Sequence, residues 1–153
     1  MDELTAKKFS EAVDYLHSYN YFKRRIDWLS DNIETLESSL DAVTSFSHVR
    51  VKQSGDPYRR EKLLAEIADK KKELQERKEG LELQGLEVLN TISKIPDPRI
   101  SKVLMLEYVQ GMSQEQIREK YNNELPLTYW YDGIMMVVKI LDQKEQMPDS
   151  MTA

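Results

Sequence analysis

Hydrophobic residues recur in the first third of the chain at alternating steps of three and four residues. They are Tyr19, Phe22, Ile26, Leu29, Ile33, Leu36, Leu40 and Val43. This spacing puts all of them on one side of a helix over about seven turns, while polar and charged residues fill the other positions. Neither glycine nor proline interrupts residues 2–47. The pattern therefore predicts one long helix, from about residues 2–5 to about residues 44–47, with these residues as a coiled-coil core.

A second long helix is predicted after a break at residues 44–58, where Ser, Gly and an Asp-Pro pair cluster as in a loop at the tip of a hairpin. Pro57 fits the first helical position with Asp56 as its cap, and the helix runs to about residue 94. Its apolar edge is weaker than the first. Two helices of similar length favour an antiparallel coiled-coil hairpin, although the same stripe is compatible with a parallel coiled-coil dimer.

Strong stop and start signals divide the last third of the chain into short helices. The sequence Ile-Pro-Asp-Pro at 95–98 ends the second helix and caps a third, which should end at Gly111. Ser113 and Gln116 have the spacing of a capping box, which predicts a short helix to about residue 122. After it we expect a turn at 123–126 and a last helix at about 127–143. This order is typical of a trihelical helix-turn-helix. We therefore expect an all-α chain: a hairpin at 1–95, a helix-turn-helix at 96–145 and a disordered tail at 146–153.

Composition narrows the function classes. The 153 residues contain no cysteine, which excludes disulfides, thiolate zinc sites and thiol catalysis. The two histidines have no carboxylates at metal-ligand spacing, and no phosphate loop or nucleophile elbow is present, so we expect no enzyme activity, metal or cofactor. The acidic N-terminus is unlike a signal peptide, and no stretch approaches the roughly 18–20 apolar residues that span a bilayer. We expect a cytoplasmic protein without a membrane partner.

Eight positions between residues 97 and 141 form a recognisable motif: Asp97, Leu104, Tyr108, Gly111, Ser113, Glu115, Ile117 and Leu141. Together they resemble region 4 of sigma-70 factors and its relatives among phage regulators. Residues 21–45, with their Arg-Arg-Ile-Asp and Val-Thr-Ser sequences, are similar to small proteins of Gram-positive phages related to the RinA and ArpU type regulators of late genes. The resemblance covers most of residues 15–141 and implies a transcription regulator that binds phage promoters in the host bacterial cytoplasm.

The helix that would read DNA departs from this pattern. No Arg or Lys lies between Lys120 and Lys139, and residues 97–145 contain six basic and eight acidic residues. DNA-reading helices usually present basic or amide side chains to bases and phosphates. If the unit binds DNA, the helix that begins near Leu127 enters the major groove. The expected contact residues are then Lys102, Arg118 and Lys120 for phosphates, and Asn123, Thr128, Tyr129 and Tyr131 for bases.

Three consecutive aromatic residues at the start of this helix offer an alternative. Tyr129, Trp130 and Tyr131 suit a protein interface, because aromatic side chains anchor such contacts. The partner would then be RNA polymerase, a sigma factor or another host or phage protein. Trp130 is also expected to fill the core of the small domain, whereas Tyr129 and Tyr131 fit the core and the surface equally. In either case we expect a homodimer. A third hypothesis for the function is a purely structural coiled-coil protein.

Overall fold

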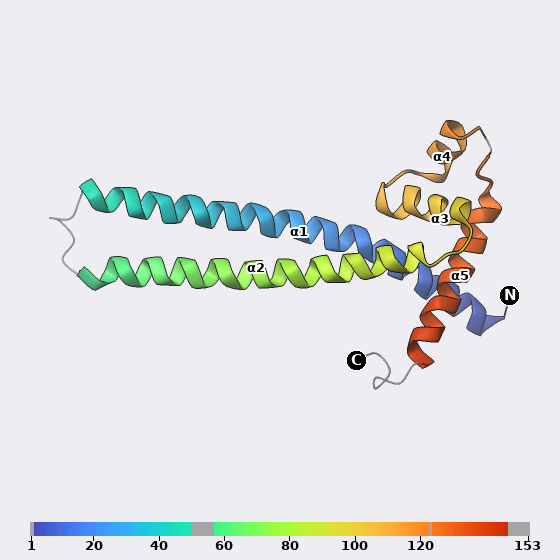
Figure 1. Ribbon diagram of the computed structural model, residues 1–153, viewed down its shortest axis with the longest axis horizontal. Helices are drawn as coiled ribbons and strands as arrows, with labels where there is room; N and C mark the ends of the chain where they lie inside the picture. Colours follow the sequence, from blue (N-terminus) through green and yellow to red (C-terminus); the bar gives the residue numbers. More distant parts are fainter. Residues whose placement is uncertain (1, 50–56, 123, 147–153) are drawn as a thin grey trace. The chain divides into compact units, whose positions relative to one another are not determined.

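The computed structural model describes residues 2–49, 57–122 and 124–146. These residues form helices and turns without a strand, which confirms the all-α prediction. The order of elements is α1 (Glu3–Val49), α2 (Pro57–Ser93), α3 (Pro98–Leu104), the π-helix η1 (Met105–Val109), α4 (Gln114–Lys120) and α5 (Leu127–Gln146) (Figure 1). None of the helices in the described residues combines the length and the apolar character that crossing a membrane requires.

The first helix starts where expected and ends later than expected. Asp2 accepts a hydrogen bond of 2.6 Å from the backbone N–H of Thr5 and caps the start of α1. The predicted loop at 44–58 is wrong at 44–49, which are helical, whereas the second helix starts at Pro57 as predicted. At this end the Thr44 hydroxyl donates to the Leu40 carbonyl one turn earlier, so this polar side chain bonds within the helix instead of ending it. The predicted cap Asp56 lies outside the described residues.

The start signals of the short helices are confirmed. The Asp97 carboxylate accepts from the Arg99 N–H, and Pro98 occupies the first turn of α3. Ser113 and Gln116 form the complete capping box of α4. The ends differ from prediction by a few residues, since α4 ends at Lys120 and α5 continues to Gln146. Asn123 and the predicted tail from residue 147 onward lie outside the described residues.

A π-helical turn replaces the predicted end of the third helix. Residues Met105–Val109 continue α3 with wider spacing, and the Gln110 N–H bonds to the Met105 carbonyl five residues earlier at 3.0 Å. Gly111 then adopts a positive φ of 75°, and the Met112 N–H reaches the Leu106 carbonyl at 2.9 Å. Gly111 is therefore the left-handed stop that the sequence predicted, although the turn before it is not α-helical.

The chain divides into two compact units. The helix-pair unit is Phe22–Leu83, and the terminal unit combines Met1–Tyr21 with Gln84–Ala153. The start of α1 and the end of α2 belong to the second unit because they bond to the short helices. Lys8 Nζ lies 2.9 Å from Asp142 Oδ2 on α5, and the Ser101 hydroxyl of α3 donates to the Ile92 carbonyl.

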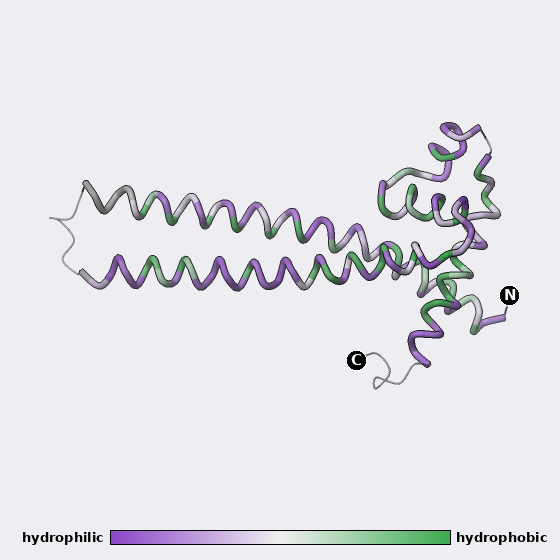
Figure 2. The backbone as a smooth tube through the Cα atoms, viewed as in Figure 1, coloured by the Kyte–Doolittle hydropathy of each residue, from purple (hydrophilic) through white to green (hydrophobic). Residues whose placement is uncertain are grey.

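In the helix-pair unit, α1 and α2 lie side by side and run in opposite directions (Figure 1). Leu29 and Ile33 form a buried cluster with Leu74, and Leu36 and Leu81 pack against it. Figure 2 shows hydrophobic positions recurring along both helices between hydrophilic stretches. The predicted stripe is only partly buried: beyond Leu29 and Ile33, its members are half-buried, namely Tyr19, Phe22, Ile26, Leu36, Leu40 and Val43.

One hydrophobic cluster in the core of the terminal unit connects the short helices. Val103 and Leu106 form one cluster with Ile117 and Leu125, which joins α3, η1 and α4 to the turn before α5. The half-buried side chains packed against this cluster are Met112, Tyr121, Tyr129 and Trp130. Gly133 brings α5 close to α3, because a Cβ there would lie 3.0 Å from Leu104 and 3.1 Å from Ile100.

Candidate nucleic-acid interface

Two of the predicted phosphate ligands share one aromatic ring. Lys102 on α3 and Lys120 at the end of α4 are exposed, and their ammonium groups lie 4.5 Å and 5.7 Å from the ring centroid of Tyr121. Tyr121 is held in place by packing on the cluster of Val103 and Ile117. An aromatic face attracts cations without neutralising them, so both charges are positioned and still available to an anion.

A third cation extends this basic surface toward α5. The Arg99 guanidinium lies 5.3 Å from the ring centroid of Tyr129, on the first turn of α5. Arg99 and Lys102 are three residues apart and therefore lie on one side of α3. Arg99 also contacts the capping carboxylate of Asp97 at 3.6 Å, which offsets part of its charge. We call Arg99, Lys102, Lys120 and Tyr121 the basic face.

The fourth basic side chain lines a shallow pocket beside the start of α5. Arg118 is exposed and borders this pocket together with apolar residues of α3, α4, α5 and the turn before α5: Val103, Ile117, Leu125, Pro126, Leu127 and Trp130. Thr128 is exposed on the first turn of α5, as a base-reading residue must be, and Leu127 is 50% exposed. Asn123, the remaining predicted contact, lies outside the described residues.

Acidic side chains accompany the basic ones, as the sequence predicted. Glu115 and Glu119 are exposed on α4, Glu124 is exposed in the turn, and Asp132 is exposed on α5. Each would repel a phosphate brought near it. This surface therefore carries a few positioned cations and no broad positive field.

The aromatic residues at the start of α5 make contacts inside the terminal unit. Trp130 donates from its indole nitrogen to the Tyr108 hydroxyl at 3.0 Å, and its ring lies 5.6 Å from that of Phe9 at a steep angle. Tyr131 lies 5.4 Å from the same phenylalanine and is still 41% exposed. Trp130 thus packs on the core as predicted, but it stays half-buried. Phe9 covers part of the surface that was predicted for a partner.

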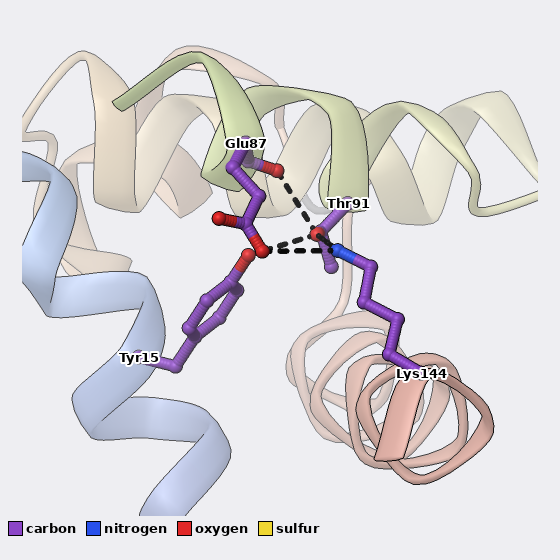
Figure 3. A network of polar contacts seen from close by, with 4 residues as sticks. All are labelled: Tyr15, Glu87, Thr91 and Lys144. Carbon is purple, nitrogen blue, oxygen red and sulfur yellow. Dashed lines mark hydrogen bonds and ion pairs between the residues drawn. The ribbon is translucent and has the colours of Figure 1, made fainter. Parts of the chain in front are cut away.

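A polar network fixes the second half of α5 (Figure 3). The buried Thr91 hydroxyl on α2 donates to the Glu87 carbonyl at 3.0 Å. Because a hydroxyl has one proton, Thr91 must accept from Tyr15 on α1 at 2.9 Å and from Lys144 on α5 at 3.2 Å. Lys144 also lies 3.4 Å from the Glu87 carboxylate. Burial raises the pKa of Tyr15, so its hydroxyl stays protonated as this network requires.

The π-helix carries two polar groups with altered acidity. Burial raises the pKa of Tyr108 to about 12, and the same cause raises the pKa of Glu107. Glu107 Oε2 is buried and makes no hydrogen bond in the described structure. His17 contacts the Tyr108 ring edge-on at 5.0 Å, so the π-helix also packs against α1. Neither Glu107 nor Tyr108 is among the residues that line the pocket beside Arg118.

Sequence reasoning missed three residues of this site. Arg99 could have been found, since its three-residue spacing from Lys102 puts both on one side of a short helix. Tyr121 is expected from the sequence to pack between the last helices, but its contact with Lys102 gave no local signal, and neither did the contacts of Phe9 with α5. The pairing of Phe9 with Tyr131 joins residues that are more than a hundred positions apart.

No group of three or more His, Asp or Glu side chains in the described residues is arranged to hold a metal ion. No protein-family model matches the sequence, and neither a curated protein nor a solved structure is significantly similar to it.

Proposed function

We propose that this chain is a phage-type transcription regulator that acts by binding, and that its basic face contacts promoter DNA. The observation that carries the proposal is the placement of Lys102 and Lys120 on one tyrosine ring. Cations from two helices are thereby held on one ring, and Arg99, three residues before Lys102, lies over Tyr129 in the first turn of α5. Phosphate contacts of this kind position a protein on DNA, and the end of a neighbouring helix then contacts the bases and recognises their sequence.

In this arrangement α5 approaches the major groove with its first turn only. Thr128 is exposed there and can reach a base edge, whereas Trp130 and Tyr131 are occupied by Phe9. Arg118 extends the phosphate contacts along α4. Glu115, Glu119 and Asp132 are exposed on α4 and α5, so DNA that approaches these carboxylates and not the basic face is repelled. This mixture of charges favours weak non-specific binding, and it makes the affinity depend strongly on how the DNA is placed on the surface.

The proposal is tested by fluorescence anisotropy with a labelled duplex from a phage late promoter at low salt. We expect saturable binding that a longer unlabelled duplex of the same sequence competes away. A flat titration up to about 100 µM protein, weaker than typical non-specific binding, would sink the proposal. A duplex of scrambled sequence measures the specificity ratio, which is the quantity that separates a regulator from a general polyanion binder.

A second candidate is a protein-interaction module that binds the transcription machinery. The observation in its favour is the shallow pocket in which exposed Leu127 lies next to Trp130, with Arg118 at the rim. An apolar pocket with one cation fits a partner helix that has hydrophobic and acidic side chains. Pull-down of purified bacterial RNA polymerase, compared between the native chain and Leu127→Glu, tests this candidate. Equal recovery by both would exclude this surface.

A further inference from the structure

We propose that Lys102 and Lys120 hold two successive phosphates of one nucleic-acid strand, and that Tyr121 sets the spacing between the two lysines. We call these three residues the phosphate clamp. The inference rests on the proposed function, because it concerns the same basic face, and it names the chemical group that this face binds. Two diester phosphates of a single strand are a sufficient ligand, so the clamp requires neither a promoter sequence nor a duplex.

The charges of the two lysines are not neutralised within the protein. Both side chains are exposed, and among the described residues no carboxylate lies within 4 Å of the ammonium group of Lys102 or Lys120. Arg99, by contrast, contacts the carboxylate of Asp97 at 3.6 Å. An aromatic ring attracts a cation through its π-electrons without cancelling the charge. Both ammonium groups are therefore open to an anion.

The ring that carries the two lysines has a fixed support. The N–H of Tyr121 donates to the Ile117 carbonyl at 3.1 Å, and its carbonyl accepts from the Glu124 N–H at 2.9 Å. Asn122 has a positive φ of 48°, the left-handed conformation that ends a helix, so α4 stops directly at Tyr121. The Tyr121 side chain is half-buried and packs on the cluster that contains Val103. Backbone and ring are thus both held by the terminal unit.

This common support limits the distance between the two ammonium groups. Lys102 Nζ lies 4.5 Å and Lys120 Nζ 5.7 Å from the ring centroid of Tyr121. The two nitrogens can therefore be no farther apart than these distances added together, which is 10.2 Å. Successive phosphates along one strand are on the order of 7 Å apart, which lies within this limit. Each lysine can then contact one phosphate while both remain near the ring.

The placement on the ring makes the second phosphate contact favourable. An exposed lysine loses rotamer freedom when it binds an anion, and contact with the ring restricts that freedom beforehand. Once one phosphate is bound, the next phosphate of the same strand is held close to the other lysine. Glu119 and Glu124 are exposed and repel a phosphate that comes near them. These charges favour a ligand that reaches both lysines at once.

The test compares two trinucleotides that differ in one charge. The first is the thymidine trinucleotide with two phosphodiester groups, and the second has one of these groups replaced by a neutral methylphosphonate. Binding to the full chain at low salt is followed through the NMR signals of the lysine side chains. We expect the trinucleotide with two charges to bind at least about threefold more tightly. Lysines that act independently, or that share one phosphate, would give about twofold, since a second equal phosphate then only doubles the number of binding modes.

Variants assign the clamp to its three residues. Lys102→Gln and Lys120→Gln change exposed side chains, so the fold should persist, and each should lower the affinity ratio to about two. Tyr121→Leu should lower the ratio as well, whereas Tyr121→Phe keeps the aromatic face and should keep the ratio. Lys139→Gln is the matched control, because it removes an exposed charge from α5 and should leave the ratio unchanged.

A ratio of about two or less for the native chain would overturn the phosphate clamp, and so would a higher ratio that either lysine variant retains. A higher ratio retained by Tyr121→Leu would overturn the role of the ring. These results are distinct from a failure of the proposed function. A native chain that clamps the trinucleotide and does not bind the promoter duplex would contradict promoter binding alone, whereas promoter binding with a ratio of about two would contradict the clamp alone.

Discussion

The indole nitrogen of Trp130 donates a 3.0 Å hydrogen bond to the hydroxyl of Tyr108, which is 1% exposed. This bond joins α5 to the π-helix η1 and so fixes the start of α5 relative to the short helices that carry the basic face. Tyr108 in turn contacts His17 of α1. This hydrogen bond therefore helps to position the helix that we propose reads DNA.

Removing this acceptor should destabilise the fold. Tyr108→Phe keeps the ring and leaves the Trp130 N–H without its partner, so we expect a loss of about 1–2 kcal/mol in the free energy of unfolding by urea. The same change made in a Trp130→Phe background should cost much less, because that donor is already gone. Equal costs in both backgrounds would mean that the bond contributes nothing to stability.

The buried carboxyl of Glu107 should make stability depend on pH. Its pKa is raised by burial, so the protonated form stabilises the fold below the ordinary pKa, and this contribution is lost as pH rises through the raised value. Glu107→Gln keeps the shape without the charge. We expect the variant to melt higher than the native chain at about pH 7 and to equal it at about pH 4. A native chain that melts at a higher temperature than the variant at neutral pH would contradict the claim that the ionised Glu107 carboxylate destabilises the fold.

Phe9 should shield Trp130 from solvent. In a Trp28→Phe background Trp130 is the remaining tryptophan, so its emission reports on this site alone. Phe9→Ala removes the ring at 5.6 Å, and we expect stronger quenching by acrylamide with a loss of about 1–2 kcal/mol in unfolding free energy. Leu4→Ala, an exposed position on the same helix, is the control. Quenching that Phe9→Ala leaves unchanged would show that Trp130 is covered by something else.

Gly133 should tolerate no side chain. A Cβ there would lie 3.0 Å from the side chain of Leu104, which is fully buried and cannot easily move. We expect Gly133→Ala to lower the unfolding free energy by roughly 1–3 kcal/mol through overpacking, despite the better helix propensity of alanine. In a Leu104→Ala background the added methyl group has room, so the same substitution should then be neutral or stabilising. A stabilising effect in the native background would show that α3 and α5 can separate freely.

Local signals in the sequence predict the helices well. Asp97 with Pro98, Ser113 with Gln116, and Gly111 each act within a few residues, so their physical effect is visible in the sequence itself. Hydroxyl-bearing residues at the end of α1 misled the prediction, because Thr44 can end a helix or bond within it, and it does the latter.

Features that depend on long-range contacts could not be predicted. In the terminal unit, Lys8, Phe9 and Tyr15 of α1 contact α5 and the end of α2. The periodicity of the sequence does not predict such contacts. The π-helix at Met105–Val109, with Leu106 and Tyr108 buried, was likewise not predicted, since its local sequence is that of an ordinary helix. For the candidate site, the sequence supplied the lysines, and only the structure supplied Tyr121 as their common support.

The most direct test of the proposed function is the salt dependence of DNA affinity. The logarithm of the binding constant for the promoter duplex is measured against the logarithm of salt concentration for the native chain and for Lys102→Gln/Lys120→Gln. If both lysines contact phosphates, the slope should become shallower by about two for the double variant. Lys72→Gln, which removes an exposed charge from α2, should leave the slope unchanged. Identical slopes for the native chain and the double variant would contradict DNA binding through the basic face.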